Sequence, residues 1–201
     1  MRLKLSYSLI NLWQRGDTNG VIEALHGHWQ EPNEAMKFGI QKHKEWENEV
    51  NATGCMPEVF GGKELENPKT EQYYKEQLAD WLWLSGVVDL EYGKNGENIV
   101  DYKTGKGGAG AYVNSLQAGC YSLLRPNAKR FTFKHFNQYD GKTSSSVVFL
   151  TDALRAESFD KIFSIACDIR ATLETLGFED FDNVDISSRK DKDYEQQRTI
   201  E

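Results

Sequence analysis

The chain has few cysteines and no long apolar run, and each shortage excludes a class of protein. Its 201 residues include three cysteines, which are odd in number and lack the paired spacing of a zinc site, so neither a disulfide framework nor structural zinc is indicated. No apolar stretch approaches the roughly 18 residues of a membrane span, and the first residues lack the apolar core of a signal peptide. We therefore expect no membrane association and a reducing, cytoplasmic compartment.

Acidic residues outnumber basic ones in the whole chain, but one stretch has basic residues alone. The formal net charge is -7 and the pI is about 5.2, whereas nucleic-acid phosphates are recognised mainly through Lys and Arg. Residues 102–139 contain no Asp or Glu, and this stretch holds Lys103, Lys106, Arg125, Lys129, Arg130 and Lys134. An acid-free stretch of this kind is what a groove that follows phosphates requires.

Length and apolar periodicity predict one α/β domain over residues 1–178, followed by an acidic, polar tail over residues 179–201. The predicted helices are two short ones within 8–29 and longer ones over about 33–51, 115–124 and 156–176. The predicted strands are two within 71–92, a third ending near 103, and two more over about 130–137 and 146–150. This order gives an α/β sandwich, a central mixed sheet of about five strands flanked by helices.

Two of the predicted strands end in opposite charges. Asp89 lies near the end of one strand, and Asp101 and Lys103 lie near the end of the next. Alternate side chains of a strand share a face, so Asp101 and Lys103 point together, and a hairpin through residues 93–96 brings Asp89 beside them. Neighbouring carboxylates repel each other unless a proton or cation lies between them, and their oxygens are ligands that Mg²⁺ and Mn²⁺ prefer.

The cluster therefore predicts a divalent-metal site in which the lysine ammonium orients a water molecule or stabilises charge on a phosphate. The alternative is a surface salt-bridge cluster, which is common at strand ends. The glycine-rich segment that follows, residues 105–110, has the literal spacing of a dinucleotide-binding loop, but the acidic residue which that fingerprint needs is missing until Asp140. We interpret the segment as a flexible loop, or as backbone that approaches phosphates with Lys106 assisting.

Four separated motifs lie on the predicted elements in a fixed order. They are G-x-x-x-H in a helix (residues 39–43), G-x-x-D in a strand (86–89), D-x-K in the next strand (101–103) and Q-x-x-x-Y in a helix (117–121). Together they resemble the PD-(D/E)xK nuclease superfamily and, within it, the RecB-like branch that includes CRISPR-associated and phage exonucleases.

The resemblance implies a restriction-endonuclease-like fold with bound Mg²⁺ or Mn²⁺ and with Lys103 acting on the nucleophilic water. The metal ligands that it implies are His43, Asp89, Asp101 and the backbone carbonyl of Tyr102. The resemblance also implies that Gln117 and Tyr121 face DNA, and their spacing of four puts both on one side of a helix. Several relatives carry an iron–sulfur cluster on four cysteines, and this chain has neither the number nor the placement, so we expect no cluster.

The implied function is a metal-dependent deoxyribonuclease of bacterial or phage-infected cells, an exonuclease acting on single-stranded or duplex DNA in recombination, repair or phage DNA processing. A recombination or helicase protein is a further candidate partner. Two alternatives stay open: a nuclease-fold module that binds DNA or protein without cutting, and a structure-specific endonuclease with the same chemistry. Clustered carboxylates argue against the first, since they repel phosphate, but motif spacing does not separate the second from an exonuclease.

Overall fold

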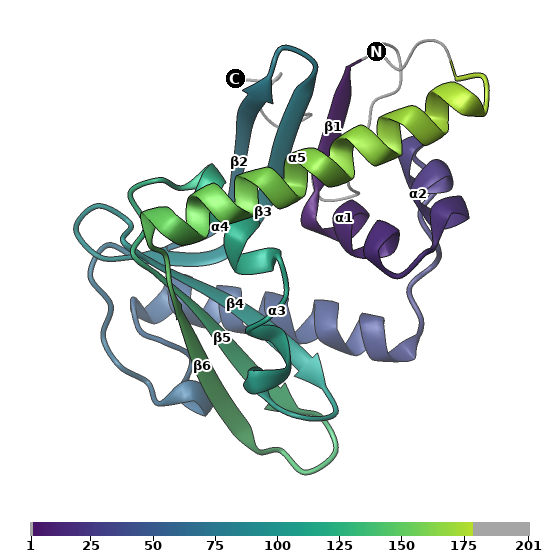
Figure 1. Cartoon of the computed structure of the whole chain (residues 1–201). Helices are drawn as coiled ribbons and strands as arrows, with labels where there is room; N and C mark the ends of the chain where they lie inside the picture. Colours follow the sequence, from purple (N-terminus) through teal and green to yellow (C-terminus); the bar gives the residue numbers. More distant parts are fainter. Residues whose placement is uncertain (1, 179–201) are drawn as a thin grey trace, which may run out of the picture.

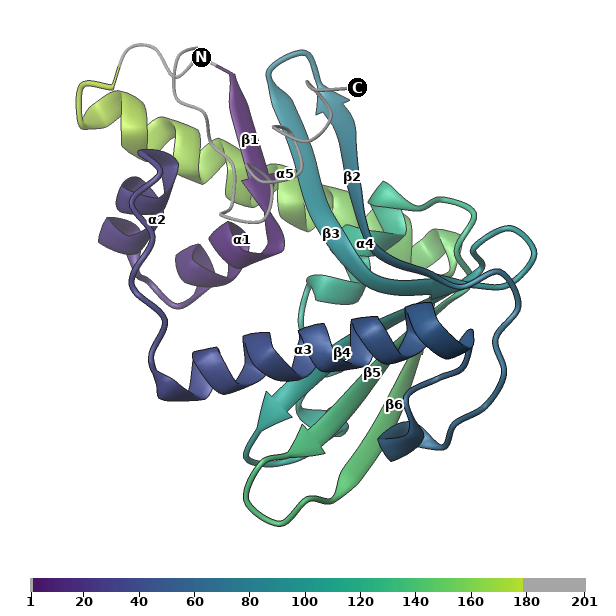
Figure 2. The same cartoon turned by 180° about the vertical axis from the view of Figure 1, so that it is seen from behind.

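A computed structural model describes residues 2–178 of the chain as a mixed β-sheet with helices on both faces (Figures 1 and 2). The strands are β1 (Leu3–Ser6), β2 (Lys69–Ala79), β3 (Leu82–Tyr92), β4 (Asn98–Gly105), β5 (Arg130–Asn137) and β6 (Thr143–Phe149). The α-helices are α1 (Tyr7–Gln14), α2 (Thr18–Leu25), α3 (Glu34–Thr53), α4 (Gln117–Leu124) and α5 (Asp152–Thr175). Two 3₁₀ turns are η1 (Glu58–Phe60) and η2 (Ala109–Tyr112).

Strand β3 is shared by two arms of the sheet: the β1 arm, and the β4 arm that also contains β5 and β6. One edge of β3 pairs with β2 along nearly its whole length. On its other edge, residues 82–85 pair in parallel with β1, and residues 90–92 pair antiparallel with β4. The strands β5 and β6 extend the sheet beyond β4, with β5 parallel to β4. The β1 and β4 arms therefore separate along residues 86–89 of β3, and Figure 2 shows β2 and β3 bending from one arm into the other.

Helices cover the two faces of the sheet unequally. In Figure 1, α4 and α5 lie in front of the sheet and α3 lies behind it. The larger core packs α1, α2, α4 and α5 against the sheet, with Phe131 and Phe133 of β5 fully buried in it. A smaller core under α3 is built on Trp46, Val50 and Tyr102. Each face of β4 and β5 thus has its own apolar layer, as the alternation of strand side chains requires.

The predicted fold class is confirmed, with one strand more than expected. The four residues of β1 are too few to show an alternating pattern, and they form a strand because β3 offers them a free edge over residues 82–85. Helix α5 begins earlier than predicted, since the Thr151 side chain accepts a hydrogen bond from the amide of Leu154 and caps the helix there. The predicted tail, residues 179–201, lies outside the described residues. Among residues 2–178, no helix is long and apolar enough to cross a bilayer.

The contact between α4 and α5 depends on Gly119. A Cβ atom added at Gly119 would lie 2.3 Å from Ser158 Oγ and 2.8 Å from Ser158 Cβ. We expect Gly119→Ala to lower the free energy of unfolding by about 1 to 3 kcal/mol, because this overlap outweighs the helix propensity gained with alanine. Urea denaturation measures the change. Gly110→Ala is the control, since its Cβ would meet nothing within 4 Å, and Ser158→Gly should restore the loss if the overlap causes it.

Candidate active site

The two predicted carboxylates meet where the arms of the sheet separate. Asp89 ends the stretch of β3 that pairs with neither β1 nor β4, and Asp101 lies on β4 one position past the last residue that pairs with β3. Both are buried, with 8% and 6% of their surface exposed. The Asp89 Oδ2 atom accepts a hydrogen bond from the Tyr102 amide at 2.9 Å. This bond joins the two strands beyond their regular ladder and holds Asp89 beside Asp101, as the predicted hairpin requires.

Lys103 points to the same side of β4 as Asp101. Its Nζ atom lies 2.7 Å from Asp101 Oδ2 and 5.6 Å from the ring centroid of Tyr112 in η2. Burial works to lower the pKa of the Lys103 ammonium, but attraction to Asp101 and Asp89 outweighs it, and the pKa is raised. Lys103 therefore remains a cation throughout the neutral range.

The environment of Asp101 disfavours its charged form. Burial raises its pKa, and repulsion from Asp89 adds to the rise, while Lys103 and His43 oppose it. The carboxylate form of Asp101 thus has a higher free energy here than in water. A further cation close to both carboxylates would offset this cost, because it favours the charged form of each.

His43 approaches the carboxylates from α3, which lies on the other face of the sheet from α4 and α5. Its Nδ1 atom lies 3.4 Å from Asp89 Oδ2, and its ring lies edge-on to that of Tyr102, with the centroids 6.0 Å apart. Gly39, one turn earlier, allows this approach, since a Cβ there would lie 2.9 Å from Thr104 Oγ1 on β4. The glycine of the G-x-x-x-H motif therefore has a packing reason: it lets α3 lie close enough for His43 to face the carboxylates.

Helix α4 is attached to both carboxylate-bearing strands. Gln117 donates from Nε2 to Asp101 Oδ1 at 2.5 Å, while its buried Oε1 atom has no hydrogen-bond partner among the described residues. Tyr121 donates its hydroxyl proton to the Val87 carbonyl at 2.5 Å. Its ring packs over Gly86, where an added Cβ would lie 3.3 Å from Tyr121 Cε1. The contact of Gln117 and Tyr121 with DNA stays a prediction, and the structure gives both side chains partners inside the protein.

Lys106 is the predicted site residue that lies apart from this group. It follows the end of β4 in an exposed loop, and its Nζ atom lies 5.2 Å from the ring centroid of Tyr139 in the turn between β5 and β6. The structure thus brings His43, Asp89, Asp101, Tyr102, Lys103 and Gln117 together, and places Lys106 at the surface beyond them.

Two residues near Lys103 had no part in the motifs. His135 of β5 is in register with Lys103, is 1% exposed, and leaves its Nε2 atom without a hydrogen-bond partner among the described residues. Tyr112 lies over both, with its ring centroid 6.1 Å from that of His135. The alternation of Phe131, Phe133 and His135 along β5 was a signal that His135 faces the core. Tyr112 had no such signal, because its position depends on the loop that precedes it.

The chemistry of the donor set fits a divalent cation. Carboxylate oxygens are the ligands that Mg²⁺ and Mn²⁺ prefer, whereas an imidazole is more typical of transition-metal sites. Burial and the charge of Asp89 raise the pKa of Asp101, and a nearby cation would oppose that rise. Within residues 2–178, no three His, Cys, Asp or Glu side chains gather closely enough to hold an ion by themselves. His43, Asp89 and Asp101 are thus not closed around an ion in this structure, and they would hold one, with the Tyr102 carbonyl and water supplying further oxygens, only after their side chains draw closer. No cysteine belongs to this group, and all three thiols are free.

Comparison with known proteins finds similarity in structure only. No protein-family model and no curated protein sequence matches the chain. An alkaline exonuclease from Laribacter hongkongensis is similar with a TM-score of 0.56 at 13% identity, over 87% of this chain and 91% of that one. Its complex with dAMP gives the same score over 86% and 91% of the two chains. The protein SSO0001 also gives 0.56, at 10% identity, over 86% and 77%. At these identities the similarity establishes the fold alone, and that fold is one that a nuclease uses.

Proposed function

We propose that the chain is a divalent-metal-dependent DNA nuclease, and more specifically an exonuclease of the PD-(D/E)xK superfamily, RecB-like in type. The observation that carries the proposal is the buried pair Asp89 and Asp101, with Lys103 2.7 Å from one carboxylate and His43 3.4 Å from the other. Burying two neighbouring carboxylates costs free energy even where Lys103 and His43 lie beside them, so their retention is better explained by function than by stability. A metal that activates water beside a phosphate provides that function.

Each residue has a separate task in this proposal. Asp89 and Asp101 provide negative charge for Mg²⁺ or Mn²⁺, and His43 closes the site from α3. Bound there, the metal supplies Lewis-acid chemistry that lowers the pKa of water and offsets charge on the phosphate. Lys103 positions the attacking water and stabilises charge that builds up on the phosphate oxygens. Gln117 holds Asp101 in orientation through the hydrogen bond at 2.5 Å.

The exonuclease is favoured over a module that only binds DNA. Both carboxylates repel phosphate, so they bring no benefit to a protein that only binds DNA. Their burial also carries a cost, since it raises the pKa of Asp101. The fold shared with an alkaline exonuclease over most of both chains supports the same choice. A role in recombination, repair or phage DNA processing, and a cytoplasmic location, belong to this proposal.

Cleavage of labelled DNA tests the proposal directly. The full chain is incubated with end-labelled linear and closed circular DNA, single-stranded and duplex, with Mg²⁺, with Mn²⁺ or with EDTA. We expect linear DNA alone to be degraded, and only with metal. Cutting of circles would favour a structure-specific endonuclease instead. Binding without products under every metal condition would refute the nuclease proposal in favour of the binding module.

A further inference from the structure

Lys106 and Tyr139 form an exposed pair at the end of the sheet next to the candidate site. Lys106 follows Gly105, the last residue of β4, and Tyr139 lies in the turn that joins β5 to β6. The Lys106 Nζ atom is 5.2 Å from the Tyr139 ring centroid, and the tyrosine is 65% exposed. A cation thus lies against one of the larger exposed aromatic surfaces of the protein.

The turn that carries Tyr139 is fixed by its own hydrogen bonds. The Asn137 side chain accepts from the Tyr139 amide at 2.9 Å, and the Asn137 carbonyl accepts from the Gly141 amide at 2.8 Å. The Asp140 side chain accepts from the Lys142 amide at 3.0 Å. These bonds hold the backbone of the turn, so the ring of Tyr139 projects from a fixed position and little backbone freedom is left to lose on binding.

The loop that carries Lys106 is also attached to the sheet. The amide of Ala109 donates to Ser144 Oγ of β6 at 2.9 Å, and Ala109 is fully buried. Gly105 and Gly107 have φ angles of +130° and +96°, and nothing lies within 4 Å of a Cβ added at either. Their backbone is therefore open to a ligand from outside.

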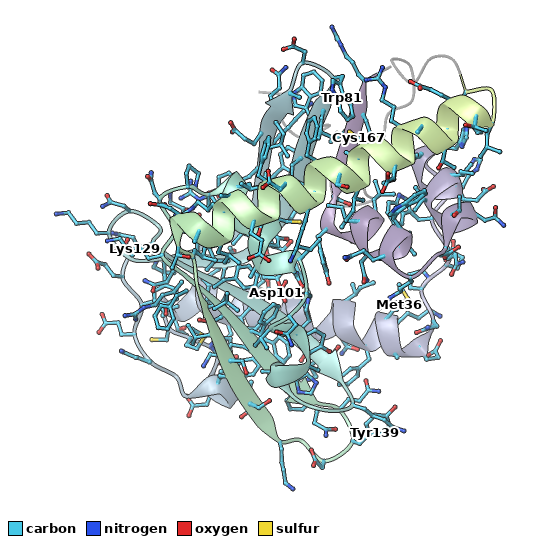
Figure 3. All side chains as sticks on the ribbon, viewed as in Figure 1. Met36, Trp81, Asp101, Lys129, Tyr139 and Cys167 are labelled. Carbon is cyan, nitrogen blue, oxygen red and sulfur yellow. The ribbon has the colours of Figure 1, made fainter. Side chains whose placement is uncertain are left out.

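Lys106 and Tyr139 lie just beyond the ends of β4 and β5, the strands that carry Lys103 and His135. Lys103 is in register with His135, and Gly105 with Asn137, so the sheet ends two residues beyond Lys103. Lys106 and Tyr139 follow immediately, about 10 Å from the catalytic lysine along the strands. Figure 3 places Tyr139 at the tip of the hairpin, with Asp101 in the interior.

The charge around the pair suits a polyanion. Residues 102–139, which include both members, contain no acidic residue. The first acid after them, Asp140, has Lys142 Nζ 3.5 Å from its Oδ2 atom. The acid next to Tyr139 in the chain thus has a cation beside it, and Lys106 lies against the ring.

We infer that Tyr139 and Lys106 bind an unpaired DNA strand next to the active site, with Tyr139 stacking on a base and Lys106 contacting a phosphate. This inference rests on the proposed nuclease function and narrows its substrate to single-stranded DNA or single-stranded ends. An exposed ring stacks on a base only if that base is free of its own neighbour, which excludes the interior of a duplex. Both a stacking surface and a backbone cation are what binding to single strands requires.

Binding to three labelled probes, measured by anisotropy in EDTA so that none is cut, tests the inference on the full chain. The probes are oligothymidine, an abasic strand of the same length, and a blunt duplex. We expect Tyr139→Ala to weaken binding of oligothymidine about 5- to 150-fold and to change binding of the abasic strand and the duplex little. Lys106→Ala should weaken binding of oligothymidine and of the abasic strand alike. It should also reduce the slope of log Kd against the logarithm of the salt concentration by about 0.7, the value for one phosphate contact.

Phe149→Ala is the matched control. Phe149 is 64% exposed and has Arg130 over its ring at 6.0 Å, so it repeats the chemistry of the pair. It lies at the opposite end of β6, where Leu150 donates to the carbonyl of Lys129, which Figure 3 labels far from Tyr139. We expect this variant to bind every probe like the wild type.

Three results would overturn the inference: no loss of oligothymidine binding in Tyr139→Ala, an equal loss on the abasic strand, or an equal loss in Phe149→Ala. A wild-type chain that binds no single strand would also overturn it. The test is independent of cleavage. A chain that shows the expected binding pattern but cuts no DNA with Mg²⁺ or Mn²⁺ would refute the nuclease proposal and leave only the binding of a single strand by Tyr139 and Lys106.

Discussion

Asp101→Asn is expected to lower the rate of DNA cleavage more than about 10³-fold while the protein stays folded. Asparagine has the same shape and keeps an oxygen that accepts from Gln117 Nε2, so the contact at 2.5 Å can persist. What it removes is the negative charge beside Asp89, which is the charge that a dication needs. Burial raises the pKa of the Asp101 carboxyl group, but its carboxylate is also the partner of the Lys103 ammonium at 2.7 Å. The variant should therefore stay folded with a lowered Tm, because the lysine loses that partner.

Thermal unfolding with and without Mg²⁺ separates this role from a structural one. Saturating metal should raise the Tm of the wild type, since an ion that binds the folded state stabilises it, and should raise that of Asp101→Asn much less. Asp160→Asn, on the exposed side of α5, is the control and should match the wild type in both cleavage and metal response. Full cleavage by Asp101→Asn, or an undiminished metal response, would contradict the assigned role.

Lys103→Met is expected to lower cleavage about 10²- to 10⁴-fold for a different reason. Methionine keeps an unbranched stem against Tyr112 but removes the ammonium that lies 2.7 Å from Asp101. The water and the phosphate then lose the charge that positions and stabilises them, while both carboxylates remain. We therefore expect the Mg²⁺-dependent rise in Tm to be kept, or increased, in a variant that hardly cuts.

The contrast between the two variants is the sharper test. Lys94→Met changes an exposed lysine in the turn between β3 and β4 and should cut DNA at the wild-type rate. If Lys103→Met lost its metal response together with its activity, the lysine would be a support for the carboxylates and not a catalytic group. If it cut at the wild-type rate, phosphodiester hydrolysis would not proceed through this cluster.

The carboxylate cluster was predictable because it depends on local rules. Alternation along β4 puts Asp101 and Lys103 on one face, and the hairpin turn determines which residue of β3 lies opposite them. The glycines of the motifs were harder to interpret, since their reasons lie elsewhere in the chain. Gly39 makes room for Thr104, and Gly86 makes room for the ring of Tyr121. A sequence pattern marks such positions without stating which neighbour requires them.

Tyr121 illustrates a limit of periodicity. Its spacing from Gln117 predicts a shared helix side, but whether that side faces solvent or the sheet depends on how α4 docks. In the structure, both side chains point inward, to the Val87 carbonyl and to Asp101. The prediction of DNA contact came from the resemblance, and the hydrogen bonds favour a supporting role under the carboxylates.

The sequence by itself determined the fold class, the order of the long helices and strands, and the pairing of Asp101 with Lys103, because each follows from short-range periodicity and turn chemistry. The tertiary structure alone decided that β1 pairs with β3, that the two arms of the sheet separate beside Asp89, and that Lys106 and Tyr139 lie together. Those features join segments far apart in the chain, and their position is set by which edges and faces remain to be covered once the local elements have formed.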